Sequence, residues 1–427
     1  MRARRVAGVA GVLSATLVLA GCGSGGDGDS AAQGADGRGP ITFVTQKDNS
    51  GVLPFIADEW NKAHPDEKVT IKQQSDQADQ QLSDFEQHFQ AKDPGYDVVT
   101  VDVVWTAEFA ARGWIVPLTG RHALDTDKLL PATVKAGTYN GKLYAAPYGS
   151  DGGLLYYRTD LVDSAPTTWN ELIGDCKGKT TKGTITGARP ACYAGQFAKY
   201  EGLTVNAAEA INATGGTIVG PDGRSTTVDS PKSAAGLDFL VNGFKDGYIP
   251  KEALGFQETQ SVNAFQSGQL MFMRNWPYAV AILNGKGSKV AGKFGVAPLP
   301  GPSGHGASTL GGHNLGISAY SRHQATALDF LKFIESDKVQ RNNLTVGTLA
   351  PVLTSMYSDP KLTRKFTYLP DLLKSIETAV PRPITPFYPG VTEAIETNTY
   401  AALQGRTTTA QALKNMQAAI KSATAGG

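Results

Sequence analysis

The feature that most constrains the fold is an alternation of strand-like and helix-like segments that begins near residue 41. Residues 41–45 have a short apolar strand pattern, and Leu53, Ile56 and Trp60 then repeat at helical spacing. Residues 96–104 form a nearly continuous apolar run, which is typical of a parallel strand covered on both faces. Strand and helix patterns that alternate in this way predict an α/β layer with a parallel sheet.

Length and charge narrow the class of protein further. The chain has 427 residues, enough for two lobes with their own cores. It carries 40 Lys and Arg against 39 Asp and Glu, so no basic excess points to nucleic acid as a partner. Since no internal repeat or second low-complexity linker divides the chain, the two lobes should be interwoven in sequence rather than consecutive.

The N-terminus has the pattern of an export signal. Basic residues near the start precede an apolar run over residues 6–20, which is too short for a stable membrane span. The run ends in the string 19–22, Leu-Ala-Gly-Cys, which resembles a bacterial lipobox. We therefore expect residues 1–21 to be a lipoprotein signal peptide and Cys22 to be lipidated; the alternative is a plain secretory signal. Residues 22–40 are almost all small or polar and predict a flexible tether.

The two remaining cysteines, Cys176 and Cys192, predict a disulfide. An exported chain reaches an oxidising compartment, where such a pair forms and persists. Closing a loop of about 16 residues would stabilise the fold by roughly 3 kcal/mol in the chain-entropy treatment. The alternative is two free, buried thiols.

Catalytic and cofactor motifs are mostly absent. The chain lacks the G-x-S-x-G and H-E-x-x-H patterns, and its six histidines are scattered, so we predict no metal and no cofactor. Residues 174–180 look like a phosphate loop but are one residue short and follow no apolar strand. A pair of glycosidase carboxylates cannot be recognised from spacing, because the two groups need only be close in space.

Aromatic and acidic residues at the ends of elements favour a sugar as the ligand. Asp102 lies where a strand passes into a helix, and Trp276 directly follows an apolar strand. Sugars present apolar faces that pack on aromatic rings and hydroxyl rims that bond to carboxylates. In open α/β sheets, ligands bind beyond the carboxyl ends of the strands. The alternatives are that Asp102 caps the next helix and that Trp276 belongs to the core.

Several stretches in the right order carry a family resemblance. The chain resembles the trehalose/maltose-binding lipoproteins of ABC sugar importers, within the extracellular solute-binding proteins, over essentially its whole mature length. The most specific stretches are residues 97–114, 143–147, 154–158, 264–268, 274–277, 311–315 and 382–386.

The resemblance implies an α/β, two-lobed periplasmic-binding-protein-like fold with a hinge and a central ligand cleft. Residues 41–150 and 297–340 would then form the N-terminal lobe. Residues 151–296 and 341–427 would form the C-terminal lobe. Closure of the hinge would bury the ligand and present a surface to the importer.

The resemblance also implies a set of ligand-binding residues from both lobes. They are Asp48, Gln80, Asp102, Asp151, Tyr200, Glu258, Trp276, Gly347, Thr348, Leu349 and Arg382. Asp151 stands where relatives often carry Asn. The aspartate keeps a hydrogen-bond acceptor but lacks the donors of the amide group. His313 stands where many relatives carry Trp, and the smaller ring puts the identity of the sugar in doubt.

These observations favour a non-enzymatic sugar receptor. We expect a monomer, anchored outside the cytoplasm by its N-terminal lipid, that captures a small α-glucoside such as trehalose or maltose. It would deliver this disaccharide to the permease subunits of an ABC importer. One alternative is a secreted lipoprotein enzyme acting on sugars, which would cleave a glycoside rather than release it unchanged. Another is a structural envelope lipoprotein, which would not explain the cleft-type motifs.

Overall fold

A six-stranded mixed sheet forms the centre of the first lobe. The computed structural model describes residues 36–178 and 189–425. In this sheet β1 (Ile41–Thr45) lies between β2 (Val69–Gln73) and β3 (Val98–Asp102), and both pairings are parallel. The next strand, β11 (Thr309–Ile317), is antiparallel to β3 and to β6 (Ala145–Gly152), and parallel to the short β12 (Val380–Pro381). The predicted parallel sheet therefore covers only β2, β1 and β3.

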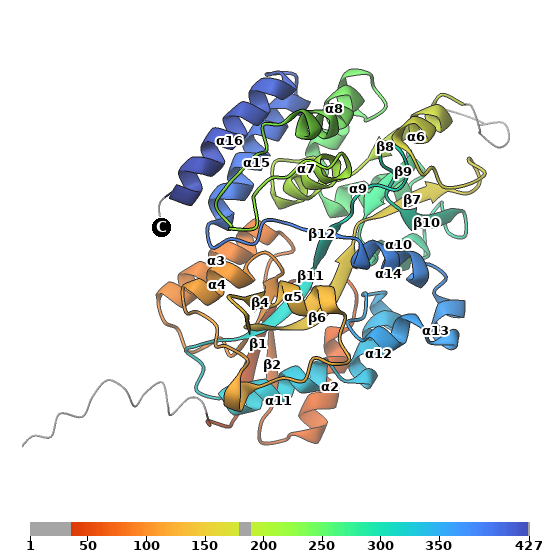
Figure 1. The fold of residues 1–427 in the computed structure, drawn as a ribbon. Helices are drawn as coiled ribbons and strands as arrows, with labels where there is room; N and C mark the ends of the chain where they lie inside the picture. Colours follow the sequence, from red (N-terminus) through yellow and green to blue (C-terminus); the bar gives the residue numbers. More distant parts are fainter. Residues whose placement is uncertain (1–35, 179–188, 426–427) are drawn as a thin grey trace, which may run out of the picture.

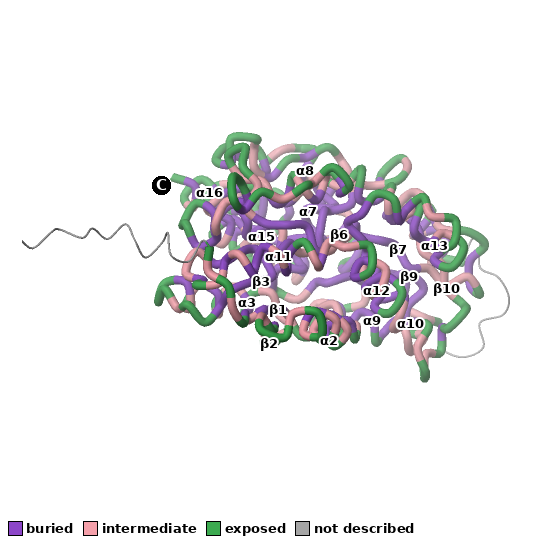
Figure 2. The backbone as a smooth tube through the Cα atoms, turned by 90° about the horizontal axis from the view of Figure 1, so that it is seen from below, coloured by how far each residue is buried: buried purple, intermediate pink, exposed green. Residues whose placement is uncertain are grey.

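Side-chain alternation along these strands gives the sheet two apolar faces. Phe43 packs toward one face with Phe330, whereas its neighbour Val44 packs toward the other with Phe85. The first face is covered by α2 (Leu53–Ala63) and α11 (Gln324–Ile334), and the second by α3 (Ala78–Gln90) and α4 (Thr106–Ala111). Figure 2 shows β1 and β3 as largely buried segments, whereas the edge strand β2 is exposed or half-buried over most of its length. A sheet covered on both faces needs apolar residues at every position, as the sequence pattern indicated.

The second lobe is built on a four-stranded sheet in the order β10-β7-β9-β8. These strands are β10 (Phe294–Pro298), β7 (Leu154–Arg158), β9 (Leu270–Asn275) and β8 (Ala191–Ala194). Helices packed around this sheet are α6 (Trp169–Cys176), α7 (Glu201–Ala213), α8 (Pro231–Lys245), α9 (Glu258–Gln266) and α10 (Ala279–Leu283). Figure 1 shows the two sheets in separate parts of the molecule.

The chain passes between the lobes more than once. Strand β6 ends at Gly152 in the first sheet, and β7 starts at Leu154 in the second. Strand β10 still belongs to the second sheet at Pro298, and β11 returns the chain to the first sheet at Thr309. The lobes are therefore interwoven, and β6 and β11, which pair with each other, lie at their junction (Figure 1).

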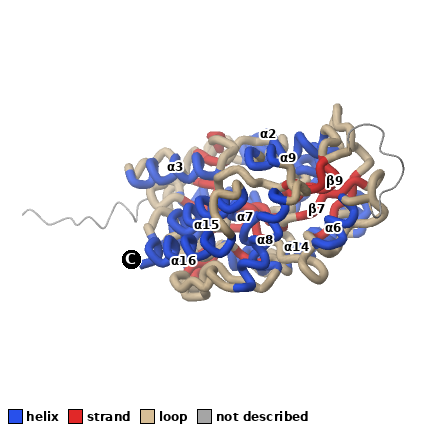
Figure 3. The backbone as a smooth tube through the Cα atoms, turned by 90° about the horizontal axis from the view of Figure 1, so that it is seen from above, coloured by secondary structure: helices blue, strands red, loops and turns tan. Residues whose placement is uncertain are grey.

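The C-terminal third adds helices to both parts of the molecule. They are α12 (Asp337–Gly347), α13 (Pro360–Lys365), α14 (Leu369–Glu377), α15 (Tyr388–Leu403) and α16 (Thr409–Ala425). Figure 3 shows α15 and α16 beside α7 and α8, with which they share a separate apolar cluster. The remaining elements between residues 36 and 425, leaving 179–188 aside, are short: α5 (Pro131–Ala136), β4 (Thr138–Tyr139), β5 (Lys142–Leu143) and three 3-10 turns (120–122, 251–255 and 354–357). No helix in the described part of the chain is long and apolar enough to cross a membrane.

The predicted disulfide is confirmed. Cys176 at the end of α6 and Cys192 in β8 are bonded, with their Cα atoms 5.3 Å apart. The bond ties the end of a surface helix to an edge strand of the second sheet. Cys22 lies outside the described residues.

Candidate ligand-binding cleft

A cavity of about 250 Å³ lies between the two lobes. The first lobe lines it with the segments that follow β1 and β2 and with the last residue of β3. The second lobe contributes the beginnings of α7 and α9 and the segment after β9. Because the parallel strands β1, β2 and β3 all end at this edge, the cavity lies where open α/β sheets bind ligands.

Asp48 lines the cavity but also holds the start of α2. Its Oδ1 accepts hydrogen bonds from the backbone of Ser50 (3.0 Å) and Gly51 (2.7 Å), and its Oδ2 accepts one from Leu53 N–H (2.9 Å). Burial acts to raise the pKa of Asp48, but these hydrogen bonds outweigh it and leave the pKa below its ordinary value. Asp48 is therefore a fixed anion that shapes the loop after β1.

Asp102, Arg382 and Glu201 form a buried ionic network beside the cavity. The Arg382 guanidinium donates Nη2 to Asp102 Oδ1 at 2.9 Å and Nη1 to Glu201. Tyr388 O–H also donates to Glu201, and Thr392 Oγ1 donates to its other oxygen at 2.7 Å. Burial raises the pKa of Glu201 above its ordinary value, although the charge of Arg382 opposes this. The network connects β3 of the first lobe with α7 of the second.

The second lobe presents a hydrogen-bonded pair to the cavity. Tyr200, just before α7, donates its hydroxyl to Glu258 Oε2 at 2.6 Å, and Glu258 is the first residue of α9. Burial and the Glu258 carboxylate raise the pKa of Tyr200 well above its ordinary value. The tyrosine therefore stays a neutral donor and the carboxylate an acceptor, which together suit hydroxyl groups.

Trp276 provides the aromatic surface of the cavity. It directly follows β9 and is half-buried. The Arg274 guanidinium lies over its ring at 3.7 Å from the centroid. A Cβ on Gly311 would come within 2.8 Å of the ring, so only glycine fits there. The ring is thus held at its back and edge and still lines the cavity.

Strands β6 and β11, at the junction of the lobes, add titratable groups to the cavity. Asp151 on β6 and His313 on β11 both line the cavity. Burial raises the pKa of Asp151 to about 7, with Arg274 opposing and Asp102 reinforcing the shift. Burial lowers the pKa of His313, although the carboxylate of Asp102 opposes this. The neutral form of His313 is therefore favoured near neutral pH, whereas Asp151 carries a proton in a large share of the molecules and gives it up as the pH rises.

Eight of the eleven residues that the resemblance implied line the cavity. They are Asp48, Asp102, Asp151, Tyr200, Glu258, Trp276, Leu349 and Arg382.

The structure places the other three residues outside the cavity lining. Gln80 is exposed on α3 and donates to Gln77. Thr348 is buried in a left-handed conformation (φ 51°) behind Trp276, where its hydroxyl lies 3.4 Å from the carbonyl of Pro277. Gly347 lies against the loop after β1, so near to Ser50 that an added Cβ would be 2.9 Å from the Ser50 Cβ. Gly347 and Thr348 thus support the lining from behind.

Other lining residues were not anticipated from the sequence. Asp76 follows β2, so the same strand-end reasoning that singled out Asp102 could have found it. Tyr148 is the extra residue on β6 where its pairing with β11 shifts between His313 and Asn314. Such irregularities redirect side chains and leave no periodic signal in a single sequence. Glu201 is the first residue of the apolar helix α7, and in the sequence it resembles an ordinary acidic residue in a first helical turn.

Comparison with known proteins identifies the family. The model of the bacterial extracellular solute-binding proteins matches residues 45–341. The chain belongs to this family. A probable ABC transporter-binding protein of Deinococcus radiodurans is 33% identical over 380 residues, covering 84% of this chain and 87% of that protein.

Two solved structures of sugar-binding relatives share the fold. The maltose-bound MalE3 of T. maritima is 32% identical, covers 90% of this chain and 99% of that one, and superposes with a TM-score of 0.82. The GacH receptor of Streptomyces glaucescens, solved unliganded and with acarbose, is 25% identical, with coverages of 91% and 99% and a TM-score of 0.78. The two-lobed α/β binding-protein fold predicted from the sequence is therefore confirmed.

Membership of the family fixes the general role. This protein is a non-enzymatic, extracellular solute-binding protein that works with an ABC transporter. Of the two solved relatives, one binds maltose and the other acarbose. The alternative of a sugar-cleaving enzyme is accordingly set aside.

Proposed function

We propose that this protein captures a small α-glucoside, with maltose or trehalose as the first candidates, between its two lobes and delivers it to an ABC importer. The observation that carries the proposal is the position of Trp276, whose ring lines the cavity together with carboxylates of both lobes and the hydroxyl of Tyr200. An aromatic face flanked by directed acceptors and donors matches a sugar ring with its hydroxyl rim.

The contributions of both lobes support capture by closure. Asp102 and Asp48 come from the first lobe. Tyr200, Glu258 and Trp276 come from the second lobe. A sugar bonded to both sides would favour the closed arrangement of the lobes, because only there are all its partners within reach. The relatives that bind maltose and acarbose support a glucoside as the ligand.

Calorimetric titration of the purified protein with maltose and with trehalose tests the proposal. We expect one of the two to bind, and Trp276→Ala to weaken that binding at least about tenfold, since a buried aromatic anchor contributes about 2 kcal/mol or more. Trp169→Ala is the matched control: this half-buried tryptophan stacks on Phe239 in the second lobe. It should leave affinity unchanged. No heat and no thermal stabilisation with either sugar would refute the proposed substrate class.

The anchor remains a separate proposal. Residues 1–21 would be removed and Cys22 would carry a diacylglyceryl group, which holds the receptor at the membrane beside its permease. Mass spectrometry of membrane-extracted protein should show a modified N-terminal Cys22. A Cys22→Ala protein that stays in the membrane fraction would contradict this. The receptor would act as a monomer, with residues 22–40 as a tether.

A further inference from the structure

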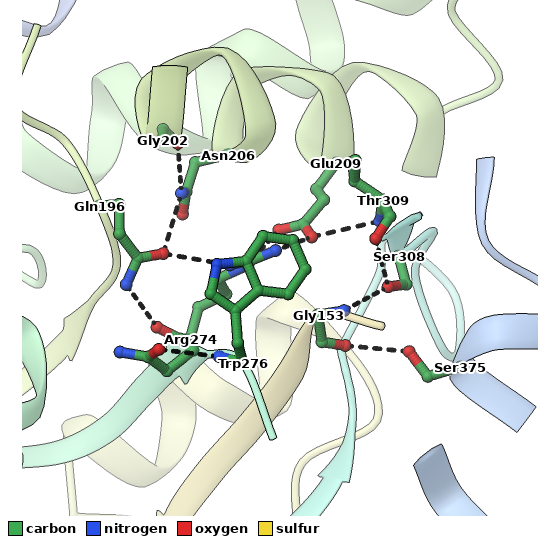
Figure 4. Close-up of polar contacts among 11 residues, drawn as sticks. Gly153, Gln196, Gly202, Asn206, Glu209, Arg274, Trp276, Ser308, Thr309 and Ser375 are labelled. Atoms are coloured by element: carbon green, nitrogen blue, oxygen red, sulfur yellow. Dashed lines mark hydrogen bonds and ion pairs between the residues drawn. The ribbon is translucent and has the colours of Figure 1, made fainter. Parts of the chain in front are cut away.

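A buried ion pair lies directly behind the ring of Trp276. Arg274 is fully buried, and its guanidinium binds both carboxylate oxygens of Glu209, with Nε–Oε2 at 2.8 Å and Nη2–Oε1 at 2.5 Å. The same guanidinium covers the indole at 3.7 Å from its centroid. Figure 4 shows the indole against Arg274, with Glu209 and Gln196 on either side.

Gln196 fixes the guanidinium from a second side. Its Oε1 accepts from Arg274 Nη1 at 3.2 Å, and its Nε2 donates to the Arg274 carbonyl at 3.1 Å. Asn206 Nδ2 in turn donates to Gln196 Oε1 and to the Gly202 carbonyl. These contacts leave the Arg274 side chain a single orientation, with its planar face toward the indole.

Glu209 also connects the Arg274 side chain to the strands at the junction of the lobes. Its Oε1 accepts from the backbone N–H of Thr309 at 3.2 Å, at the start of β11. Next to it, Gly153 N–H donates to Ser308 Oγ at 2.7 Å, and a Cβ on Gly153 would collide with the Glu209 carboxylate. The ring of Trp276 is therefore positioned relative to β11 and β6 as well as to its own lobe (Figure 4).

Stability alone gives no reason for this arrangement. Replacing a buried ion pair by apolar residues of similar volume is often neutral or stabilising, because both charges must first be desolvated. A guanidinium stacked on an indole nevertheless fixes the angle of the ring, which an aliphatic side chain would not do. Arg274 thus contributes by fixing the orientation of the indole ring.

We propose that Arg274, held by Glu209, is a positioning residue that sets the ring of Trp276 as the stacking surface for the ligand. The inference rests on the proposed sugar-binding function, and Arg274 acts through Trp276 without touching the ligand. Its planar fork is the required feature, so lysine should not replace it.

The first experiment observes Trp276 without any ligand. Protein labelled with 5-fluorotryptophan gives one 19F resonance for each of its five tryptophans. The resonance that disappears in Trp276→Phe is that of Trp276. Arg274→Lys and Glu209→Gln should shift and broaden the Trp276 resonance, because the ring samples several orientations. Arg341→Lys, on an exposed arginine paired with Asp337 and Asp359, is the control and should change nothing. An unchanged Trp276 resonance in both variants overturns the proposal.

The second experiment measures maltose and trehalose affinity in a double-mutant cycle. Arg274→Lys should weaken binding about three- to thirtyfold, where the upper value corresponds to a desolvated cation–π contact. In the Trp276→Ala background it should weaken binding less than about twofold, since no ring remains to be positioned. Equal losses in both backgrounds would overturn the proposal, because Arg274 would then act on the ligand or on the fold.

A glycine variant provides an independent perturbation that keeps the ion pair. Gly311→Ala places a methyl group 2.8 Å from the indole and should displace the same 19F resonance and weaken sugar binding. If the unaltered protein binds neither sugar, the proposed function fails, while the 19F measurements still decide the role of Arg274. If Arg274→Lys does not fold, Glu209→Gln decides it, and Gly311→Ala shows whether displacing the ring weakens sugar binding.

Discussion

Removing Arg382 should destabilise the protein far more than removing a surface arginine. The Arg382, Asp102 and Glu201 side chains are only 3%, 12% and 9% exposed, so Arg382→Met leaves two carboxylates without their cation. Breaking a buried pair in this way costs about 3–5 kcal/mol. Glu201 keeps the hydroxyls of Tyr388 and Thr392, and Asp102 keeps Val104 N–H, which places the expected cost at the lower end.

Urea unfolding followed by circular dichroism measures this cost. Arg121→Met is the matched control, because Arg121 is 58% exposed and pairs with Asp36, which is 81% exposed. Such a surface pair contributes at most about 1 kcal/mol. The reasoning is refuted if the two methionine variants lose the same free energy of unfolding.

The loss should also depend on pH. The pKa of Glu201 is already raised by burial, and without Arg382 it rises further. A carboxyl group whose folded pKa exceeds its unfolded pKa favours folding at low pH, and this contribution is lost as the pH rises through the folded value. The deficit of Arg382→Met should therefore grow as the pH rises above the ordinary pKa of a glutamate, and adding Glu201→Gln should recover part of it. A deficit that does not change with pH would contradict this account.

Two further predictions concern single groups. Replacing Cys176 and Cys192 together by alanine should lower the free energy of unfolding by about 3 kcal/mol for a loop of 16 residues, measured by urea unfolding without reductant; an unchanged midpoint would argue that the bond adds nothing. Because the pKa of Asp151 is raised to about 7, its ionisation opposes folding increasingly from about pH 4 to about pH 7. Asp151→Asn should thus stabilise the unliganded protein by up to about 4 kcal/mol at about pH 8 but by less than about 2 kcal/mol at about pH 5; a gain independent of pH would count against the raised pKa.

Most of the fold could be predicted from sequence because its signals are local. The spacing of Leu53, Ile56 and Trp60 predicted α2, and the apolar run over residues 96–104 predicted β3. The antiparallel place of β11 next to β3 carried no local signal, since pairing between distant strands depends on the path of the chain through the hinge.

The residues of the candidate site also divide into those with a local sequence signal and those without one. Residues at strand ends, such as Asp102 and Trp276, could be found because strand ends and ring chemistry are visible in the sequence. The roles of Arg274 and Glu209 could not, because they depend on contacts across 65 residues of chain. Thr348 shows the limit of family motifs, since its conformation supports the lining without reaching the cavity.

The interwoven strands also set the order in which this protein can fold. Strand β11 covers the edge of β3, yet it consists of residues 309–317, and β12 adds residues 380–381 to the same sheet. Synthesis proceeds from the N-terminus, so one edge of β3 stays unpaired until β11 has been made. Pairing over such distances is slow and exposes strand edges to aggregation. The sheet of the first lobe is thus completed only after the strands of the second lobe, β7 to β10, have been made.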